Sequence, residues 1–196
     1  MKNSALNVPN TLSLIRVLLV PVFVATLLFM RDIPVWGAVV PAVVYILTGL
    51  TDMLDGKIAR KYNLITDFGK FIDPLADKFM VLSSMIAILV WMILRGDTTL
   101  ALIFVWVVLI ILLRELGVTS LRLVVAGKSG IVVAASMLGK IKTVSQMVGT
   151  VVLIVEPVFC DNHILSYVFM AVMAFTTVFS GLDYLKAYLP HIDTNK

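Results

Sequence analysis

The sequence predicts an all-α integral membrane protein with six transmembrane helices. Of its 196 residues, 60% are hydrophobic and only 14% are charged, and the mean hydropathy is +1.03. Because a soluble domain carries about 25% charged residues, most faces of this chain are expected to meet lipid. The length fits a single membrane domain over residues 1–196.

Six apolar stretches are each long enough to cross a bilayer, which takes roughly 20 residues in a helix. Polar segments such as RDIP, RGDTT and AGKSG separate them. The expected spans are Leu12–Met30, Val35–Leu54, Phe71–Leu94, Leu100–Val125, Leu138–Val155 and Ile164–Leu185.

An even number of spans places both termini on one side of the membrane, and the basic residues indicate which side. Nearly all Lys and Arg residues fall on the face that carries the termini, and only Arg31 and Arg95 fall on the other. Because positive residues stay cytoplasmic, a multi-pass protein of the cytoplasmic membrane with cytoplasmic termini is expected. No cleaved signal peptide is evident, and the single cysteine, Cys160, excludes an intrachain disulfide.

The segment LTDMLDGKIARKYNLITDFGKFIDPLADK, residues 50–78, places acidic residues next to apolar spans. On a helix that turns about 100° per residue, Asp52, Asp55, Gly56 and Arg60 share one stripe. After a turn at KYNLITD, Thr66 is well placed to N-cap the next helix.

In the second helix Gly69, Asp73 and Asp77 follow i, i+4, i+8 spacing. Two antiparallel helices joined by a short turn pack together, so four carboxylates are expected to converge at the cytoplasmic end. Solvated helix-end aspartates are the simpler alternative. A buried charge costs roughly 2.5–3.5 kcal/mol, so four on two facing stripes favour a compensating cation. All-oxygen ligation suits Mg²⁺ or Mn²⁺, and four carboxylates can hold two such ions.

The spacing D52-x-x-D55-G56-x-x-A59-R60, then G69, D73 and D77, resembles the signature of the CDP-alcohol phosphotransferase family. Three further segments, VPNTLSLIRVLLVPVF, RELGVTSLR and GKIKTVSQM, resemble the phosphatidylglycerophosphate-forming branch of that family. The resemblance implies a six-helix fold, a homodimer and a cytoplasmic site. The implied reaction joins CDP-diacylglycerol to sn-glycerol 3-phosphate, with no role for nucleic acid.

The resemblance also implies a role for each motif position. Asp77 would be the general base as well as a metal ligand. Two divalent cations would be held by Asp52, Asp55, Asp73 and Asp77. The CDP-diacylglycerol site would be lined by Asn10, Thr11, Leu12, Ser13, Gly56, Arg60, Thr66 and Gly69.

A phosphate-bearing acceptor needs cations, and two later helices supply candidates. Arg114 and Arg122 lie about two turns apart on one helix, and Lys142 begins a polar stripe on the next. Lys140 points elsewhere on a regular helix, but the resemblance places it in the same motif. The alternative is that these cations only fix topology, or that Arg114 pairs with Glu115 or a site aspartate.

Two other functions compete with this interpretation. The same family chemistry with another acceptor, above all inositol phosphate, would also need cations. A cation channel or transporter that uses the aspartates as an ion path is a different class of protein. The carboxylates gather at one end without an acidic ladder in the other spans, which disfavours that class. The three tryptophans, Trp36, Trp91 and Trp106, are expected at interfacial or lipid-facing positions.

Overall fold

The protein is described here by a computed structural model. The structure describes residues 7–62, 66–129, 136–160 and 162–189, and the side chains of residues 53–61, 67, 70, 126, 128 and 129 lie outside that description. All regular structure in the described ranges is helical. The helices are α1 Val8–Phe29, α2 Trp36–Tyr62, α3 Asp67–Arg95, α4 Thr98–Ser129, α5 Met137–Phe159 and α6 Ile164–Tyr188.

The six helices correspond to the six expected spans, and each extends beyond the predicted apolar stretch on at least one side. Five of them are long and apolar enough to cross a membrane. The sixth, α2, contributes a shorter apolar stretch, Trp36–Asp52, over the part whose side chains are described. The chain is therefore a multi-pass membrane protein with the predicted helix order.

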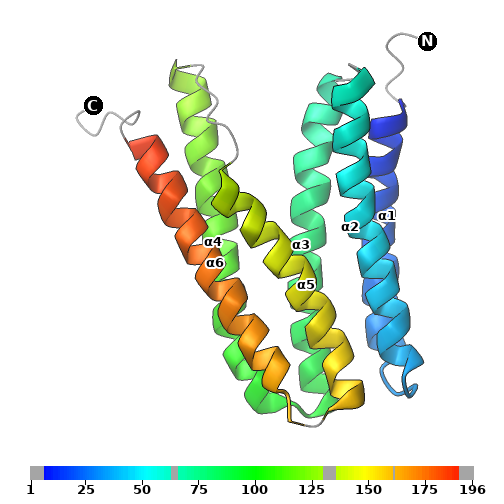
Figure 1. Ribbon diagram of the computed structural model, residues 1–196. Helices are drawn as coiled ribbons and strands as arrows, with labels where there is room; N and C mark the ends of the chain where they lie inside the picture. The colour runs from blue at the N-terminus through cyan, green and yellow to red at the C-terminus, as the bar shows by residue number, and fades with distance from the viewer. Residues whose placement is uncertain (1–6, 63–65, 130–135, 161, 190–196) are drawn as a thin grey trace.

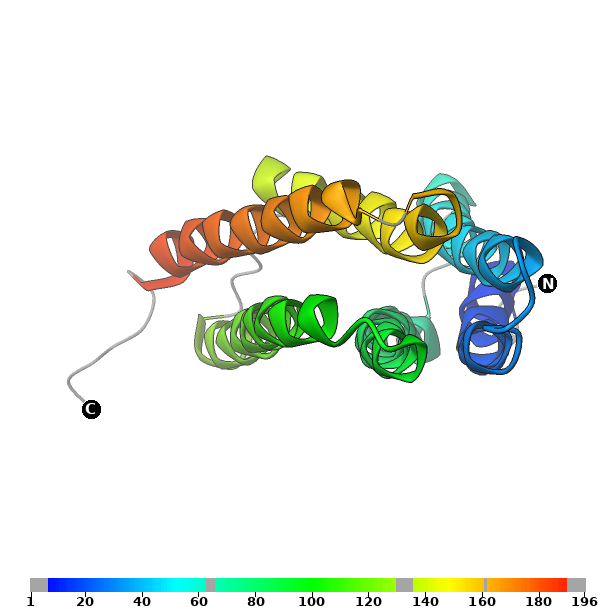
Figure 2. The same cartoon turned by 90° about the horizontal axis from the view of Figure 1, so that it is seen from below.

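The helices stand side by side in two rows of three. Viewed along the bundle, α1, α3 and α4 form one row and α2, α5 and α6 form the other (Figure 2). The packed pairs close a ring in the order α1, α2, α5, α6, α4, α3, and α3 also meets α5 across it. Helix α1 begins and α6 ends at the same end of the bundle (Figure 1), as an even number of spans requires.

The outer surface of the bundle is apolar, and the core between the rows is also apolar. Large side chains such as Leu18, Trp106 and Leu113 are 70% to 77% exposed, so they face lipid in a membrane. Trp36 is exposed as predicted, but Trp91 is not, since it is 1% exposed. That prediction was wrong because Trp91 lies on the face of α3 that packs into the main core cluster.

Helices α1 and α3 are joined near the site by polar contacts. Thr66 caps α3 as predicted, accepting a hydrogen bond from the Gly69 amide at 3.0 Å. The same hydroxyl oxygen accepts a 2.8 Å bond from the Asn10 side-chain amide. A Cβ on Gly69 would lie 2.6 Å from Asn10 Oδ1, so this joint needs glycine for close approach.

At the opposite end of the bundle, Glu156 of α5 caps the first turn of α6. Its carboxylate accepts the backbone amides of Leu165 at 2.7 Å and Ser166 at 2.5 Å, and also the Ser166 hydroxyl. A carboxylate is stabilising at a helix N-terminus because it meets unpaired amides and the positive end of the helix dipole. This contact joins the end of α5 to the start of α6 and fixes the turn between the two helices.

Glu156→Gln should lower the free energy of unfolding by about 1–3 kcal/mol, because charge-assisted hydrogen bonds to the α6 amides are weakened. The measurement is thermal unfolding of the detergent-solubilised protein. Asp32→Asn is the matched control at the same end, since the Asp32 side chain is 82% exposed. An unchanged melting temperature for Glu156→Gln would show that the contacts of Glu156 with the α6 amides do not contribute to the stability of the fold.

Gly69→Ala should destabilise the protein by about 1–2 kcal/mol. The added methyl group would overpack against Asn10 and Thr66, and the free energy lost in this way is larger than the gain from the higher helix propensity of alanine. Gly117→Ala is the control, since its added Cβ meets no atom within 4 Å. That variant should be neutral or slightly stabilised in the same unfolding assay. Equal stability of the two variants would contradict the close α1–α3 joint.

Candidate active site

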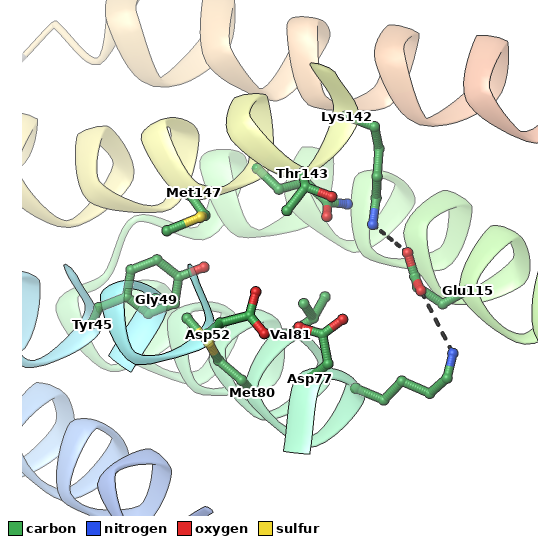
Figure 3. A pocket seen from close by; sticks show the side chains of 12 residues that line it. Tyr45, Gly49, Asp52, Asp77, Met80, Val81, Glu115, Lys142, Thr143 and Met147 are labelled. Carbon is green, nitrogen blue, oxygen red and sulfur yellow. Dashed lines mark hydrogen bonds and ion pairs between the residues drawn. The ribbon is translucent and has the colours of Figure 1, made fainter. Parts of the chain in front are cut away.

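A pocket opens between α2, α3, α4 and α5, and it has an acidic and a basic half. Asp52 of α2 and Asp77 of α3 provide the acidic half (Figure 3). Lys78, Glu115 and Lys142 provide the basic half. The remaining wall is formed by Tyr45, Gly49, Met80, Val81, Thr143, Gln146 and Met147.

The acidic half is held by side chains of α1. Arg16 is fully buried, and its Nη1 lies 2.9 Å from Asp52 Oδ1. The buried Ser13 hydroxyl donates a 2.5 Å hydrogen bond to Asp73 Oδ1. Asp77, one turn after Asp73, is exposed toward the pocket. Thus α1 positions two of the four predicted metal ligands, while Asp77 is left facing the space where a substrate would enter.

The basic half is centred on Glu115 of α4, whose side chain is 13% exposed. Lys142 of α5 donates a hydrogen bond to Glu115 Oε1, and Arg114 Nη1 lies 2.9 Å from the same oxygen. Lys78 of α3 lies 3.8 Å from Glu115 Oε2 and donates to the Thr119 hydroxyl. The single carboxylate of Glu115 therefore forms ion pairs with three cations that come from three helices. We call Lys78, Arg114, Glu115 and Lys142 the cation cluster.

Arg114 is also held from the far side by α6. Its Nη2 donates a 2.9 Å hydrogen bond to the Ser180 hydroxyl, and its guanidinium lies 5.3 Å from the centre of the Tyr184 ring. Contacts with a hydroxyl and an aromatic face fix the direction of the guanidinium. The arginine is thereby the most rigidly placed cation of the cluster.

The predicted acceptor residues divide into two pairs. Lys142 lies in the pocket wall and is 4% exposed, and Arg114 joins it through Glu115. Arg122 is exposed, and its guanidinium lies 5.8 Å from the Tyr184 ring. Lys140 is exposed and is absent from the pocket wall, which agrees with its direction on a regular helix. Phosphate binding by any of the four stays a prediction.

The predicted nucleotide residues of α1 lie on two faces of the helix. Asn10 and Ser13 are buried against α3. Thr11 is exposed, and its hydroxyl donates to the Asn7 carbonyl oxygen at 3.0 Å. Leu12 is half-buried. Of the four, the structure therefore brings only Asn10 and Ser13 together on the buried face of α1.

Three predicted site residues of α2, Asp55, Gly56 and Arg60, have side chains outside the described part of the chain. Within the described part, no three acidic, His or Cys side chains lie close enough together to hold a metal ion. The available donors are carboxylate oxygens of Asp52, Asp73 and Asp77, which suit a hard divalent cation. The predicted pair of cations stays a prediction.

Three residues of the site were not among the predicted ligands: Arg16, Lys78 and Glu115. Each had a signal in the sequence, since Arg16 and Glu115 are charges inside apolar spans and Lys78 follows Asp77 directly. A charge at that depth is usually paired and functional. Glu115 was weighed as a partner for Arg114, and the structure confirms that contact.

Comparisons with known proteins agree with the motif and the fold. The family model described as CDP-alcohol phosphatidyltransferase matches residues 6–179. The chain is 39% identical over 194 residues to the CDP-diacylglycerol–glycerol-3-phosphate 3-phosphatidyltransferase of Bacillus subtilis (strain 168), covering 91% of this chain and 93% of that protein.

Two further relatives come from distant bacteria. The probable phosphatidylglycerophosphate synthase of Mycobacterium tuberculosis (strain CDC 1551 / Oshkosh) is 37% identical, covering 95% of this chain and 83% of that protein. The CDP-diacylglycerol–glycerol-3-phosphate 3-phosphatidyltransferase of Yersinia enterocolitica serotype O:8 / biotype 1B (strain NCTC 13174 / 8081) is 36% identical, covering 93% of this chain and 94% of that protein. The chain belongs to the CDP-alcohol phosphatidyltransferase family.

Proposed function

We propose that this protein transfers the phosphatidyl group of CDP-diacylglycerol to sn-glycerol 3-phosphate, giving phosphatidylglycerophosphate and CMP. The observation that carries the proposal is the two-sided pocket, in which Asp52 and Asp77 share a wall with two lysines, Lys78 and Lys142, that are held by Glu115. The names of the relatives support the same reaction. The acceptor has a hydroxyl at one end and a phosphate at the other, which matches the two halves.

Asp77 is the general base of the proposed reaction. The acceptor hydroxyl must lose a proton as its oxygen attacks the β-phosphorus, and a carboxylate within hydrogen-bond reach can accept it. A bond forms between that oxygen and phosphorus, the bond from phosphorus to the CMP oxygen breaks, and CMP leaves. Asp77 is suited to this role because it faces the pocket, whereas Asp52 and Asp73 are held by α1.

Members of this family use divalent metal ions. We infer that Asp52, Asp55, Asp73 and Asp77 hold two such ions, Mg²⁺ or Mn²⁺. Bound there, they would neutralise charge on the pyrophosphate and on departing CMP. Arg16 limits the repulsion between Asp52 and its neighbours whether or not a cation is bound.

The proposed site lies on the cytoplasmic side of the membrane, because most Lys and Arg residues share the end at which α1 begins and α6 ends. CDP-diacylglycerol would reach it from the lipid, with its nucleotide toward Asn10, Ser13 and Thr66. A homodimer is part of the proposal by analogy with the family. Inositol phosphate is the serious second acceptor, because the same cations would receive its phosphate.

The direct test is synthesis by the detergent-purified protein from CDP-diacylglycerol and a panel of acceptors. Turnover should be at least about tenfold higher with sn-glycerol 3-phosphate than with inositol phosphate, serine or glycerol, because these acceptors lack the phosphate that the cation cluster would bind or carry it at another distance from the hydroxyl. Chelation should abolish the reaction, and Mg²⁺ or Mn²⁺ should restore it. Preference for another acceptor, or lipid synthesis without added metal after chelation, would reject the proposal.

Asp77→Asn should lower kcat at least about 100-fold, because loss of a general base typically removes a factor of 10²–10⁴. Asp183→Asn is the matched control, since it removes one carboxylate from α6 near the same end of the bundle. Initial rates of phosphatidylglycerophosphate formation at saturating substrates provide the measurement. Full activity of Asp77→Asn in a protein of normal thermal stability would exclude Asp77 as the base.

A further inference from the structure

The cation cluster contains an acidic residue at the place where an acceptor phosphate would bind, which needs an explanation. Glu115 makes contact with Lys78, Arg114 and Lys142, and Lys78, Glu115 and Lys142 all line the pocket. A fixed carboxylate beside a phosphate costs binding energy, since like charges 4 Å apart repel by about 4 kcal/mol at an effective dielectric constant of 20. A site built only to attract phosphate would not contain this residue.

We propose that Glu115 is the resting counter-ion of the acceptor-phosphate site, a positioning residue that holds the three cations together until a phosphate displaces it. The inference rests on the proposed function, because it takes the acceptor to carry a phosphate. It adds a role that the catalytic proposal does not require.

The charges support a displacement of this kind. Three cations against one carboxylate leave a surplus of two positive charges in the cluster. That surplus attracts an anion, and a phosphomonoester, which carries about −1.5 to −2 near neutral pH, competes for the three cations with more charge than Glu115 has. An acceptor without a phosphate cannot compete for the cations, so Glu115 also makes the site selective against neutral and zwitterionic acceptors.

The contacts of the cations divide the cluster into fixed and movable parts. Arg114 keeps its bonds to Ser180 and Tyr184 when Glu115 leaves. Lys78 keeps the Thr119 hydroxyl, which in turn donates to the Glu115 backbone carbonyl at 2.7 Å. Lys142 has a long flexible stem, and within the described part of the chain Glu115 is the side chain to which it donates a hydrogen bond. Lys142 is therefore the cation that transfers from carboxylate to phosphate.

The test is binding of inorganic phosphate to the substrate-free, full-length protein in detergent, measured by isothermal titration calorimetry. Glu115→Gln should bind phosphate at least about tenfold more tightly than the unmodified protein, because the competing charge is gone. The control Asp183→Asn should match the unmodified protein. Unchanged or weaker phosphate binding by Glu115→Gln would overturn the proposal.

A kinetic comparison separates this role from a merely structural one. In Glu115→Gln the KM for sn-glycerol 3-phosphate should fall in parallel with the phosphate Kd, while the KM for CDP-diacylglycerol stays the same. A structural role would raise both KM values together with a loss of thermal stability. If the protein prefers another phosphorylated acceptor, the proposed function fails but the phosphate titration still decides the role of Glu115.

Glu115→Asp keeps the inference testable if the glutamine variant does not fold. It retains the charge but shortens the side chain by one methylene, so it cannot reach Lys78 and Lys142 together as Glu115 does. Its phosphate affinity should lie between those of the unmodified protein and Glu115→Gln. Affinity equal to or weaker than that of the unmodified protein would contradict the displacement.

Discussion

Charged groups inside an apolar bundle have to be neutralised by one another, because lipid provides no hydrogen-bonding partner. Two such pairings organise the site. In the acidic half, Arg16 of α1 forms an ion pair with Asp52 of α2. In the basic half, Glu115 of α4 forms ion pairs with Lys78 of α3 and Lys142 of α5. Each pairing joins side chains from different helices. The charges needed for chemistry therefore also hold the helices in the arrangement that creates the pocket.

The two halves of the pocket suit a substrate with two different ends. In the proposed reaction the acidic half activates a hydroxyl, and the cation cluster receives a phosphate. Helix α3 contributes Asp77 to the acidic half and Lys78 to the basic half, and α5, which meets α3 across the ring of helices, contributes Lys142 to the basic half. The contacts of Asn10 with Thr66 and of Ser13 with Asp73 fix α1 against the start of α3. In the proposed reaction the packing of the helices would thereby set the spacing between the general base and the cations.

The fold was predictable where its determinants are local. Apolar runs defined the helices, and Thr66 before the start of α3 indicated its cap. The partners within the site were not predictable, because Arg16 and Asp52, or Glu115 and Lys142, are brought together only by the packing of helices. The buried position of Trp91 was missed for the same reason, since composition does not tell which face of a span meets lipid and which meets protein.

The central claim is that the acceptor lies between Asp77 and the cation cluster. A structure determined by cryo-electron microscopy with sn-glycerol 3-phosphate and a divalent cation bound tests it directly. The phosphate is expected within hydrogen-bonding distance of Arg114 and Lys142, with the free hydroxyl toward Asp77 and with Glu115 displaced. A phosphate held instead by Arg122 and Lys140, with Glu115 still bound to Lys142, would contradict it.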